Sequence, residues 1–225
     1  MKKILLTAFE PFGGETMNPS QEVVRRICGM TLDGLQIETC ELPVERFRAI
    51  ELALERIRLS KPDVVIMLGE AGGRSCITPE RMAVNMDDFR IPDNAGYQPK
   101  RDPIVVGGPM EYFSTLPVDG IVEHLTQAHI HAALSNDAGH FLCNRLFYCV
   151  MHTIATEALP MRAGFIHLPY LPEQAINKKP ETPSMSLETM VHALTLIIDH
   201  IISGSPVRLD AVVPKVAPAV LGKSG

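Results

Sequence analysis

The pattern of apolar and polar positions predicts strands that alternate with helices. An apolar run at residues 2–8 indicates a first, buried strand. After it, Asn18, Pro19 and Gln21 have the order expected of an N-cap, a first helical residue and the partner that completes a capping box. The chain therefore begins with a strand, a loop and a helix.

The same alternation continues along the chain. Residues 63–69 are almost uninterruptedly aliphatic, which is typical of a parallel strand covered on both faces. The other elements predicted from apolar spacing are strands at 35–42, 79–87, 130–134 and 163–168 and helices at 47–60, 118–127, 142–155 and 187–202. This order predicts a mostly parallel sheet between two layers of helices.

Two segments lack this periodicity. Residues 88–117 are rich in Pro, Gly and Asp, and loops of that length are usually functional or disordered. Residues 205–225 contain several prolines that break the helical pattern. We therefore expect a single catalytic α/β domain at 1–204 and a C-terminal tail at 205–225, which is either flexible or docks on a neighbouring subunit.

Composition narrows the class of protein. With 46% hydrophobic and 21% charged residues, the 225-residue chain is ordinary for a globular protein. Its net charge of -5 is spread along the chain without a basic block, which argues against a nucleic-acid partner. No apolar stretch approaches the ~20 residues that span a bilayer, and the apolar run after the first two lysines is too short for a signal peptide. We expect a soluble protein with no membrane partner.

The cysteine and histidine patterns argue against disulfides and metals. The five cysteines form an odd set without a Cys-x-x-Cys spacing, and the eight histidines are dispersed. Neither pattern indicates a disulfide framework or a zinc site. Reduced thiols in the cytoplasm fit this composition best.

Candidate chemistry lies in loops that follow the predicted strands. Carboxyl ends of parallel strands meet at one edge of a sheet, so the loops there come together. The loops that qualify are residues 9–14 (FEPFGG), 70–74 (EAGGR), 136–144 (NDAGHFLCN) and 167–170 (HLPY).

Cys143 is the candidate nucleophile. It falls in the first turn of a predicted helix, where free N–H groups and the helix dipole favour a thiolate and lower the pKa of the thiol. The alternative is a buried structural cysteine, as we expect for Cys149, Cys28 and Cys40. Cys76, beside a glycine-rich loop, is the rival nucleophile.

His167 and Glu80 are the candidate partners of that thiol. His167 ends a predicted strand at the same edge and could accept the thiol proton, although such a histidine is more often structural, and His140 competes with it. Glu80 could orient the imidazole as the third group of a triad. Its alternative is an ordinary surface pair with Arg81.

Several motifs together resemble a known family, pyroglutamyl peptidase I or pyrrolidone carboxyl peptidase. The likeness runs from the first strand to about residue 202. Its motifs are residues 9–14 (FEPFGG), 18–20 (NPS), 71–74 (AGGR), 91–94 (IPDN), 112–117 (YFSTLP) and 165–174 (FIHLPYLPEQ).

This resemblance implies a fold and a reaction. The fold is a three-layer α/β/α sandwich of the phosphorylase/hydrolase kind, with a mostly parallel mixed sheet. The reaction is cysteine-dependent hydrolysis of an N-terminal pyroglutamyl residue from peptides, with the triad at Cys143, His167 and Glu80. The family is cytoplasmic, commonly tetrameric, and works without a metal or organic cofactor.

The resemblance also implies roles in substrate binding. Phe9 and Phe12 would form the pyroglutamyl pocket, while Arg90 and the Cys143 amide would hold the oxyanion. The substrate-binding set carried over by the likeness is Phe9, Phe12, Glu70, Arg90, Phe141 and Leu142.

The chain departs from the family pattern around the catalytic loop. The family generally has Gln where Glu70 stands, Thr where Asp137 and His140 stand, and commonly His where Arg145 stands. Two alternatives follow. The chain could be a noncatalytic or altered-specificity member that binds peptide ends, or a transferase like the nucleoside phosphorylases of the same fold, which would need a phosphate site.

Overall fold

The protein is built around a five-stranded mixed sheet with strand order β2-β1-β3-β7-β4. The computed structural model describes residues 2–28 and 34–204. Strands β2, β1, β3 and β7 pair in parallel with their neighbours, and β4 pairs antiparallel to β7. The strands are β1 (Lys2–Phe9), β2 (Leu35–Leu42), β3 (Val64–Glu70), β4 (Thr78–Pro79) and β7 (Arg162–Leu168). The predicted α/β fold with a mostly parallel mixed sheet is confirmed.

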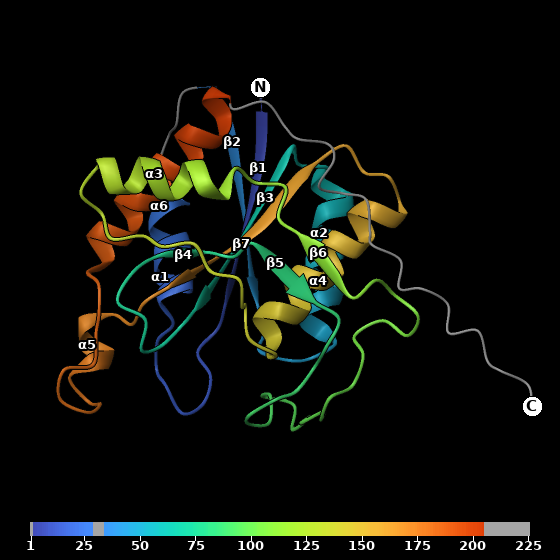
Figure 1. The fold of residues 1–225 in the computed structure, drawn as a ribbon, viewed down its shortest axis with the longest axis horizontal. Helices are drawn as coiled ribbons and strands as arrows, with labels where there is room; N and C mark the ends of the chain where they lie inside the picture. Colours follow the sequence, from blue (N-terminus) through green and yellow to red (C-terminus); the bar gives the residue numbers. More distant parts are fainter. Residues whose placement is uncertain (1, 29–33, 205–225) are drawn as a thin grey trace, which may run out of the picture.

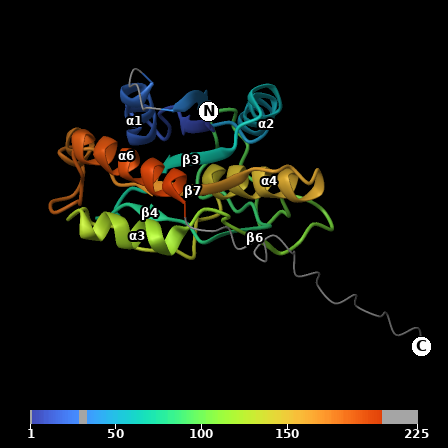
Figure 2. The same ribbon diagram turned by 90° about the horizontal axis from the view of Figure 1, so that it is seen from above.

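Helices cover both faces of this sheet (Figures 1 and 2). One apolar cluster joins the sheet to α1 (Pro19–Ile27), α3 (Val118–Gln127) and α6 (Leu187–Ser203). A second cluster on the opposite face joins it to α2 (Arg48–Ser60) and α4 (Leu142–Thr156). The helices thus form the outer two layers of a three-layer sandwich.

Local sequence explains where these elements begin and end. Asn18 caps α1, because its Oδ1 accepts a hydrogen bond from the Ser20 N–H at 3.0 Å. The predicted capping box does not form, since the Gln21 amide instead donates to Glu41 at 2.7 Å. Helix α2 ends at Lys61, whose φ of 48° is left-handed.

The predicted strand at 79–87 is wrong in extent. The chain leaves the main sheet after β4, and β5 (Met82–Val84) pairs with β6 (Glu111–Phe113) in a separate antiparallel sheet. Strand β6 lies in the segment 88–117 that was expected to be loop. A short helix, α5 (Pro172–Ala175), was also missed.

The predicted strand at 130–134 is wrong as well. This segment runs parallel to residues 77–81 but makes only isolated bridges at Ala132 and Ser135. Hydrogen bonds join Ile77 to His131 and Ala133, and Pro79 to Ser135. Pro79 has no N–H, so the bond that would make this ladder continuous cannot form.

The predicted boundary between the catalytic domain and the tail stays a prediction. Residues 205–225, the expected tail, lie outside the described residues. Among the helices of residues 2–28 and 34–204, none combines the length and apolarity that crossing a bilayer requires.

Candidate active site

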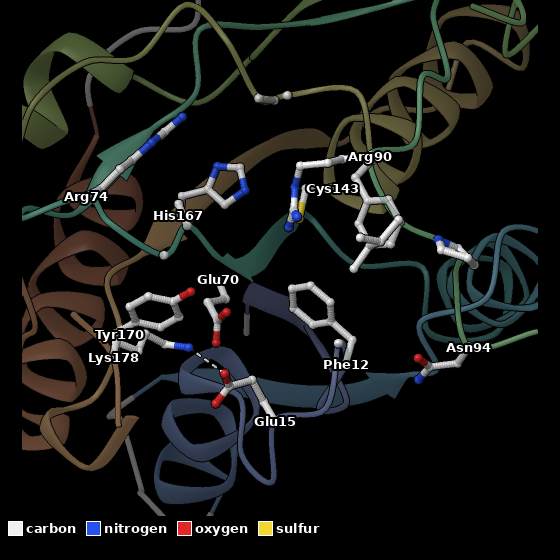
Figure 3. Close-up of a pocket in the computed structure, with 18 residues that line it drawn as sticks. Phe12, Glu15, Glu70, Arg74, Arg90, Asn94, Cys143, His167, Tyr170 and Lys178 are labelled. Carbon is white, nitrogen blue, oxygen red and sulfur yellow. Dashed lines mark hydrogen bonds and ion pairs between the residues drawn. The ribbon is translucent and has the colours of Figure 1, made fainter. Parts of the chain in front are cut away.

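A cavity of about 840 Å³ opens where the carboxyl ends of β3 and β7 meet the start of α4 (Figure 3). The four loops that were expected to converge all contribute to its lining, together with residues of the segment 90–94, Glu15 and Lys178. The lining residues are Phe12, Gly13, Glu15, Glu70, Ala71, Gly72, Arg74, Arg90, Ile91, Pro92, Asn94, Ala138, Gly139, Phe141, Cys143, His167, Tyr170 and Lys178. Its size is that of a small-molecule or peptide-end site.

Cys143 is the second residue of α4, and its partly exposed side chain faces the cavity. The N-cap residue, Phe141, makes no side-chain hydrogen bond to the first turn. First-turn N–H groups, including that of Cys143, are therefore available to an anion in the cavity. On its other side the sulfur packs on Gly69, where an added Cβ would approach Sγ to 2.9 Å.

His167 and Glu80 form a buried pair. His167 Nδ1 lies 2.7 Å from Glu80 Oε1, and the Glu80 side chain is 0% exposed. A carboxylate only accepts hydrogen bonds, so Nδ1 carries the proton and a neutral ring has its lone pair on Nε2. Figure 3 shows this ring beside the Cys143 sulfur, and within residues 2–28 and 34–204 no hydrogen bond joins the two side chains. Apo active sites often have such loose contacts.

Arg74 is a residue of this site that the sequence did not single out. Its Nη1 donates to Glu80 Oε1 at 2.6 Å and to Thr78, while its Nη2 donates to the Asp137 carbonyl at 2.8 Å. Arg74 thus ties the glutamate of the pair to the loop that leads into α4. The only sequence feature that pointed to Arg74 was its position in the motif at residues 71–74.

Burial sets the protonation states of Cys143 and His167. Burial raises the pKa of the Cys143 thiol to about 12, and the carboxylates of Glu80 and Glu70 add to this increase. Burial also lowers the pKa of His167, against the opposing hydrogen bond and charge of Glu80. The expectation of a lowered thiol pKa is therefore wrong for the resting site, because burial outweighs the helix N-terminus. Thiol and imidazole are both neutral there.

An aromatic wall forms one side of the cavity. The Phe12 and Phe141 rings lie 5.8 Å apart, and Phe89 packs edge-on against Phe141 with 4.6 Å between ring centroids. The exposed Arg90 also lines the cavity. Phe12, Phe141 and Arg90 thus all line the cavity, and their contact with substrate stays a prediction.

Two other predicted binding residues do not reach the cavity. Phe9 and Leu142 are 2% and 1% exposed and belong to the apolar core between the sheet and helices α2 and α4. They do not line the cavity in this structure, so their part in substrate binding stays a prediction. Adjacent residues of a strand or a helix point to different sides of that element. Closeness in sequence to a site residue therefore does not show whether a side chain faces the cavity or the core.

Glu70 does line the cavity and is mostly buried. Its Oε2 accepts a hydrogen bond from the Gln174 amide at 2.8 Å. Burial raises the pKa of this carboxyl to about 7, an effect that the Gln174 hydrogen bond partly opposes.

The competing candidates do not join the site. Cys76 and His140 are outside the cavity lining, although the His140 carbonyl accepts from the Asp88 N–H at 3.0 Å. Arg81 pairs with Asp119 at 2.9 Å rather than with Glu80, which excludes the surface-pair alternative for that glutamate.

Two residues that depart from the family pattern have structural contacts. Asp137 Oδ1 accepts from the Gly139 N–H at 2.8 Å and so shapes the loop before Cys143. Arg145 is buried and pairs with Asp87 at 2.5 Å, while its Nε donates to the Arg46 carbonyl at 2.9 Å. These contacts tie α4 to the segments beside it.

Comparison with known proteins identifies the family. A pyrrolidone-carboxylate peptidase of Vibrio vulnificus is 52% identical over 198 residues, which cover 88% of this chain and 92% of that protein. The crystal structure of pyroglutamyl peptidase I from Bacillus amyloliquefaciens matches with a TM-score of 0.87 at 43% identity, covering 90% of this chain and 96% of that one. A mutant pyrrolidone carboxyl peptidase from Pyrococcus furiosus matches with a TM-score of 0.86 at 42% identity, covering 89% and 98%.

The family profile described as pyroglutamyl peptidase matches residues 2–204, a span that includes all of the described residues. Within that span lie the cavity, the His167–Glu80 pair and the Cys143 helix start. The chain belongs to the pyroglutamyl peptidase family.

Proposed function

We propose that this chain is a cysteine peptidase that removes the N-terminal pyroglutamyl residue from peptides, with Cys143 as nucleophile, His167 as general acid and base, and Glu80 as the group that orients His167. The observation that carries the proposal is the placement of Cys143, at a helix N-terminus, beside an imidazole bonded to a buried carboxylate. Membership of the pyroglutamyl peptidase family supports the substrate.

The aromatic wall suits the first residue of that substrate. Pyroglutamate is a neutral five-membered lactam without a terminal ammonium group, so it needs apolar walls and a few hydrogen bonds. Phe12 and Phe141 offer neighbouring apolar ring surfaces in the cavity that Cys143 also lines. An anionic clamp for an α-amino group is not required there.

Attack and proton transfer occur together in this mechanism. Because the resting thiol is neutral, His167 Nε2 takes the proton from Cys143 Sγ as the sulfur bonds to the scissile carbonyl carbon. The carbonyl oxygen becomes an oxyanion, which the Cys143 N–H and Arg90 stabilise. Removing one such donor costs ~3 kcal/mol of barrier in typical enzymes.

Two further proton transfers complete the cycle. His167 gives its proton to the leaving amine, the C–N bond breaks, and a pyroglutamyl thioester remains on Cys143. Water then attacks the thioester while His167 accepts its proton, and the thiol leaves with that proton as pyroglutamate is released. A proline after pyroglutamate should block the reaction, because its tertiary amide replaces the ordinary leaving group.

The test is hydrolysis of a pyroglutamyl fluorogenic amide. Wild type should release the fluorophore, a thiol alkylator should abolish release, and Cys143→Ser should lose at least about 1,000-fold. Cys149→Ser, on the same helix but outside the cavity lining, is the matched control and should keep activity. Equal rates for wild type and Cys143→Ser would contradict the assignment, and binding without product would favour a noncatalytic member.

Location and assembly are part of the proposal. The cysteines Cys28, Cys40, Cys76, Cys143 and Cys149 are all free. Free thiols support a reducing cytoplasm, where a thiol nucleophile stays active. We further propose a homo-oligomer, a tetramer by resemblance to the family. Light scattering after size-exclusion chromatography tests it, and a monomeric mass at micromolar concentration would contradict it.

A further inference from the structure

The cavity has two chemically different sides. Phe12 lies on the side of Cys143 away from His167, while Glu70, Tyr170 and Lys178 gather on the side of His167 (Figure 3). A single lactam ring packed against the aromatic side chains leaves the second side of a cavity of about 840 Å³ unfilled.

The reaction fixes what occupies that second side. His167 must protonate the leaving amine, so the nitrogen of the residue after pyroglutamate has to lie against its ring. The peptide therefore continues on the His167 side, along Glu70 and Tyr170.

We propose that Glu70 is a specificity-determining residue that selects peptides with a basic residue directly after pyroglutamate. This inference rests on the proposed function, and it names the class of peptide that the same cavity prefers.

On this side of the cavity, Glu70 is the carboxylate without an ion pair among the described residues. Lys178 is already paired with Glu15 at 2.5 Å, and its ammonium lies 4.4 Å from the centre of the Tyr170 ring. Glu70 Oε2 is bonded to the neutral Gln174 amide, and no Lys or Arg within residues 2–28 and 34–204 forms an ion pair with Glu70.

The free oxygen of Glu70 is positioned to receive a cation. Oε1 has no hydrogen-bond partner among the described residues, and it is not one of the polar atoms closed off from solvent. A Lys or Arg side chain of the substrate can reach it with a flexible stem and form a hydrogen-bonded ion pair. A Glu or Asp at the same substrate position would meet Glu70 and Glu15.

The ionisation of Glu70 makes this preference depend on pH. Burial raises the pKa of Glu70 to about 7, with Glu15 raising it further and Lys178 lowering it. The other charged or titratable groups lining the cavity are Arg74, Arg90, Cys143, His167 and Tyr170. The carboxyl is mostly protonated at pH 6 and mostly ionised at pH 8, so preference for a basic residue rises between these values.

Three matched peptides test the inference: pyroglutamyl-Lys-Ala, pyroglutamyl-Gln-Ala and pyroglutamyl-Glu-Ala amides, with released pyroglutamate measured by chromatography. For wild type at pH 8 we expect kcat/KM for the Lys peptide to exceed that for the Glu peptide by about fivefold or more, as for a partly exposed ion pair. In Glu70→Gln this ratio should fall about fivefold. Glu173→Gln removes an exposed carboxylate outside the cavity lining and should leave the ratio unchanged.

The outcomes separate this inference from the proposed function. Hydrolysis of the Gln peptide by wild type shows the activity whatever the preference is. A Lys-to-Glu ratio that is the same in Glu70→Gln as in wild type overturns the role of Glu70. If that variant does not fold, the wild-type ratio of Lys to Gln peptides decides: a rise from pH 6 to pH 8 supports the inference, and a flat ratio overturns it.

Discussion

Glu80 holds His167 through one carboxylate oxygen only. Oε1 accepts from His167 Nδ1 at 2.7 Å and from Arg74 Nη1 at 2.6 Å, whereas Oε2 is buried without a hydrogen-bond partner among the described residues. Both donors therefore select the same acceptor atom. This asymmetry determines how the site should respond to changes at Glu80.

Replacing Glu80 by Gln should be milder than replacing it by Ala. A Gln side chain can keep its carbonyl oxygen at the shared position and place its NH2 group where Oε2 now has no partner. That arrangement preserves the tautomer of His167 but loses the negative charge that stabilises the imidazolium. We expect kcat/KM to fall roughly 10- to 100-fold in Glu80→Gln and about 1,000-fold in Glu80→Ala.

Kinetics on the pyroglutamyl fluorogenic amide measure these losses. Far-UV circular dichroism of both variants controls for folding, because the side chain is fully buried. Equal loss in the two variants would show that the oxygen shared by His167 and Arg74 does not govern catalysis.

Cys143 should behave as a neutral thiol in the resting enzyme. Burial raises the pKa of its thiol to about 12, and the nearby carboxylates of Glu80 and Glu70 act in the same direction. The rate of alkylation by iodoacetamide at Cys143 should therefore increase by about tenfold per pH unit from pH 6 to pH 9, without a plateau. Mass spectrometry of the labelled peptide measures this rate, and Cys143→Ser gives the background. A plateau near neutral pH would mean a preformed thiolate and imidazolium pair.

Arg74 should act as a positioning residue for both Glu80 and the loop before the nucleophile. Arg74→Gln removes the ion pair with Glu80 and the bond to the Asp137 carbonyl, so we expect kcat to fall roughly 10- to 100-fold. The positive charge of Arg74 also lowers the pKa of His167. Because His167 must be neutral to accept the thiol proton, the acidic limb of the pH profile should move to higher pH in the variant.

Arg81→Gln is the matched control for Arg74. Its guanidinium pairs with the exposed Asp119 at 2.9 Å and does not line the cavity. Activity and pH profile of that variant should match wild type. An Arg74→Gln profile with an unchanged acidic limb would restrict Arg74 to a purely structural role.

The sequence predicted the main elements because their patterns are strong and local. The aliphatic strand β3 is confirmed as buried, and on the predicted helix α6 the residues at helical spacing, Met190, Leu194, Ile197 and Ile201, are buried too. The strand predicted at 130–134 failed because it depends on pairing with a distant segment. There, Pro79 interrupts the ladder that residues 130–135 would otherwise form.

The candidate site was likewise predictable only where local pattern and topology determine it. Topology was enough to bring His167 and Cys143 to one edge, because strand ends converge in parallel sheets. Arg74 and the charge pattern around Glu70 needed the structure, since they depend on contacts across long stretches of chain. The thiol pKa was misjudged because sequence shows the helix N-terminus but not the burial that opposes it.

A histidine pair between α3 and α6 should make stability depend on pH. The rings of His124 and His200 stack with 5.2 Å between centroids, and both Nε2 atoms are buried without a hydrogen-bond partner among the described residues. Burial and the neighbouring His124 lower the pKa of His200, whereas Asp199 and Glu123 raise it. Since the pKa of an unfolded histidine is about 6.5, the folded state binds fewer protons below that value.

The sign of the effect follows from this difference in proton binding. The contribution of His200 is complete above about pH 6.5 and is lost progressively as pH falls below it, so acid should lower the melting temperature. His200→Gln cannot titrate, and its melting temperature should drop less between pH 8 and pH 5.5 than that of wild type, by about 1 to 3 °C. His192→Gln, an exposed position on the same helix, should behave like wild type. Identical pH dependence in wild type and His200→Gln would show that protonation of this pair does not oppose folding.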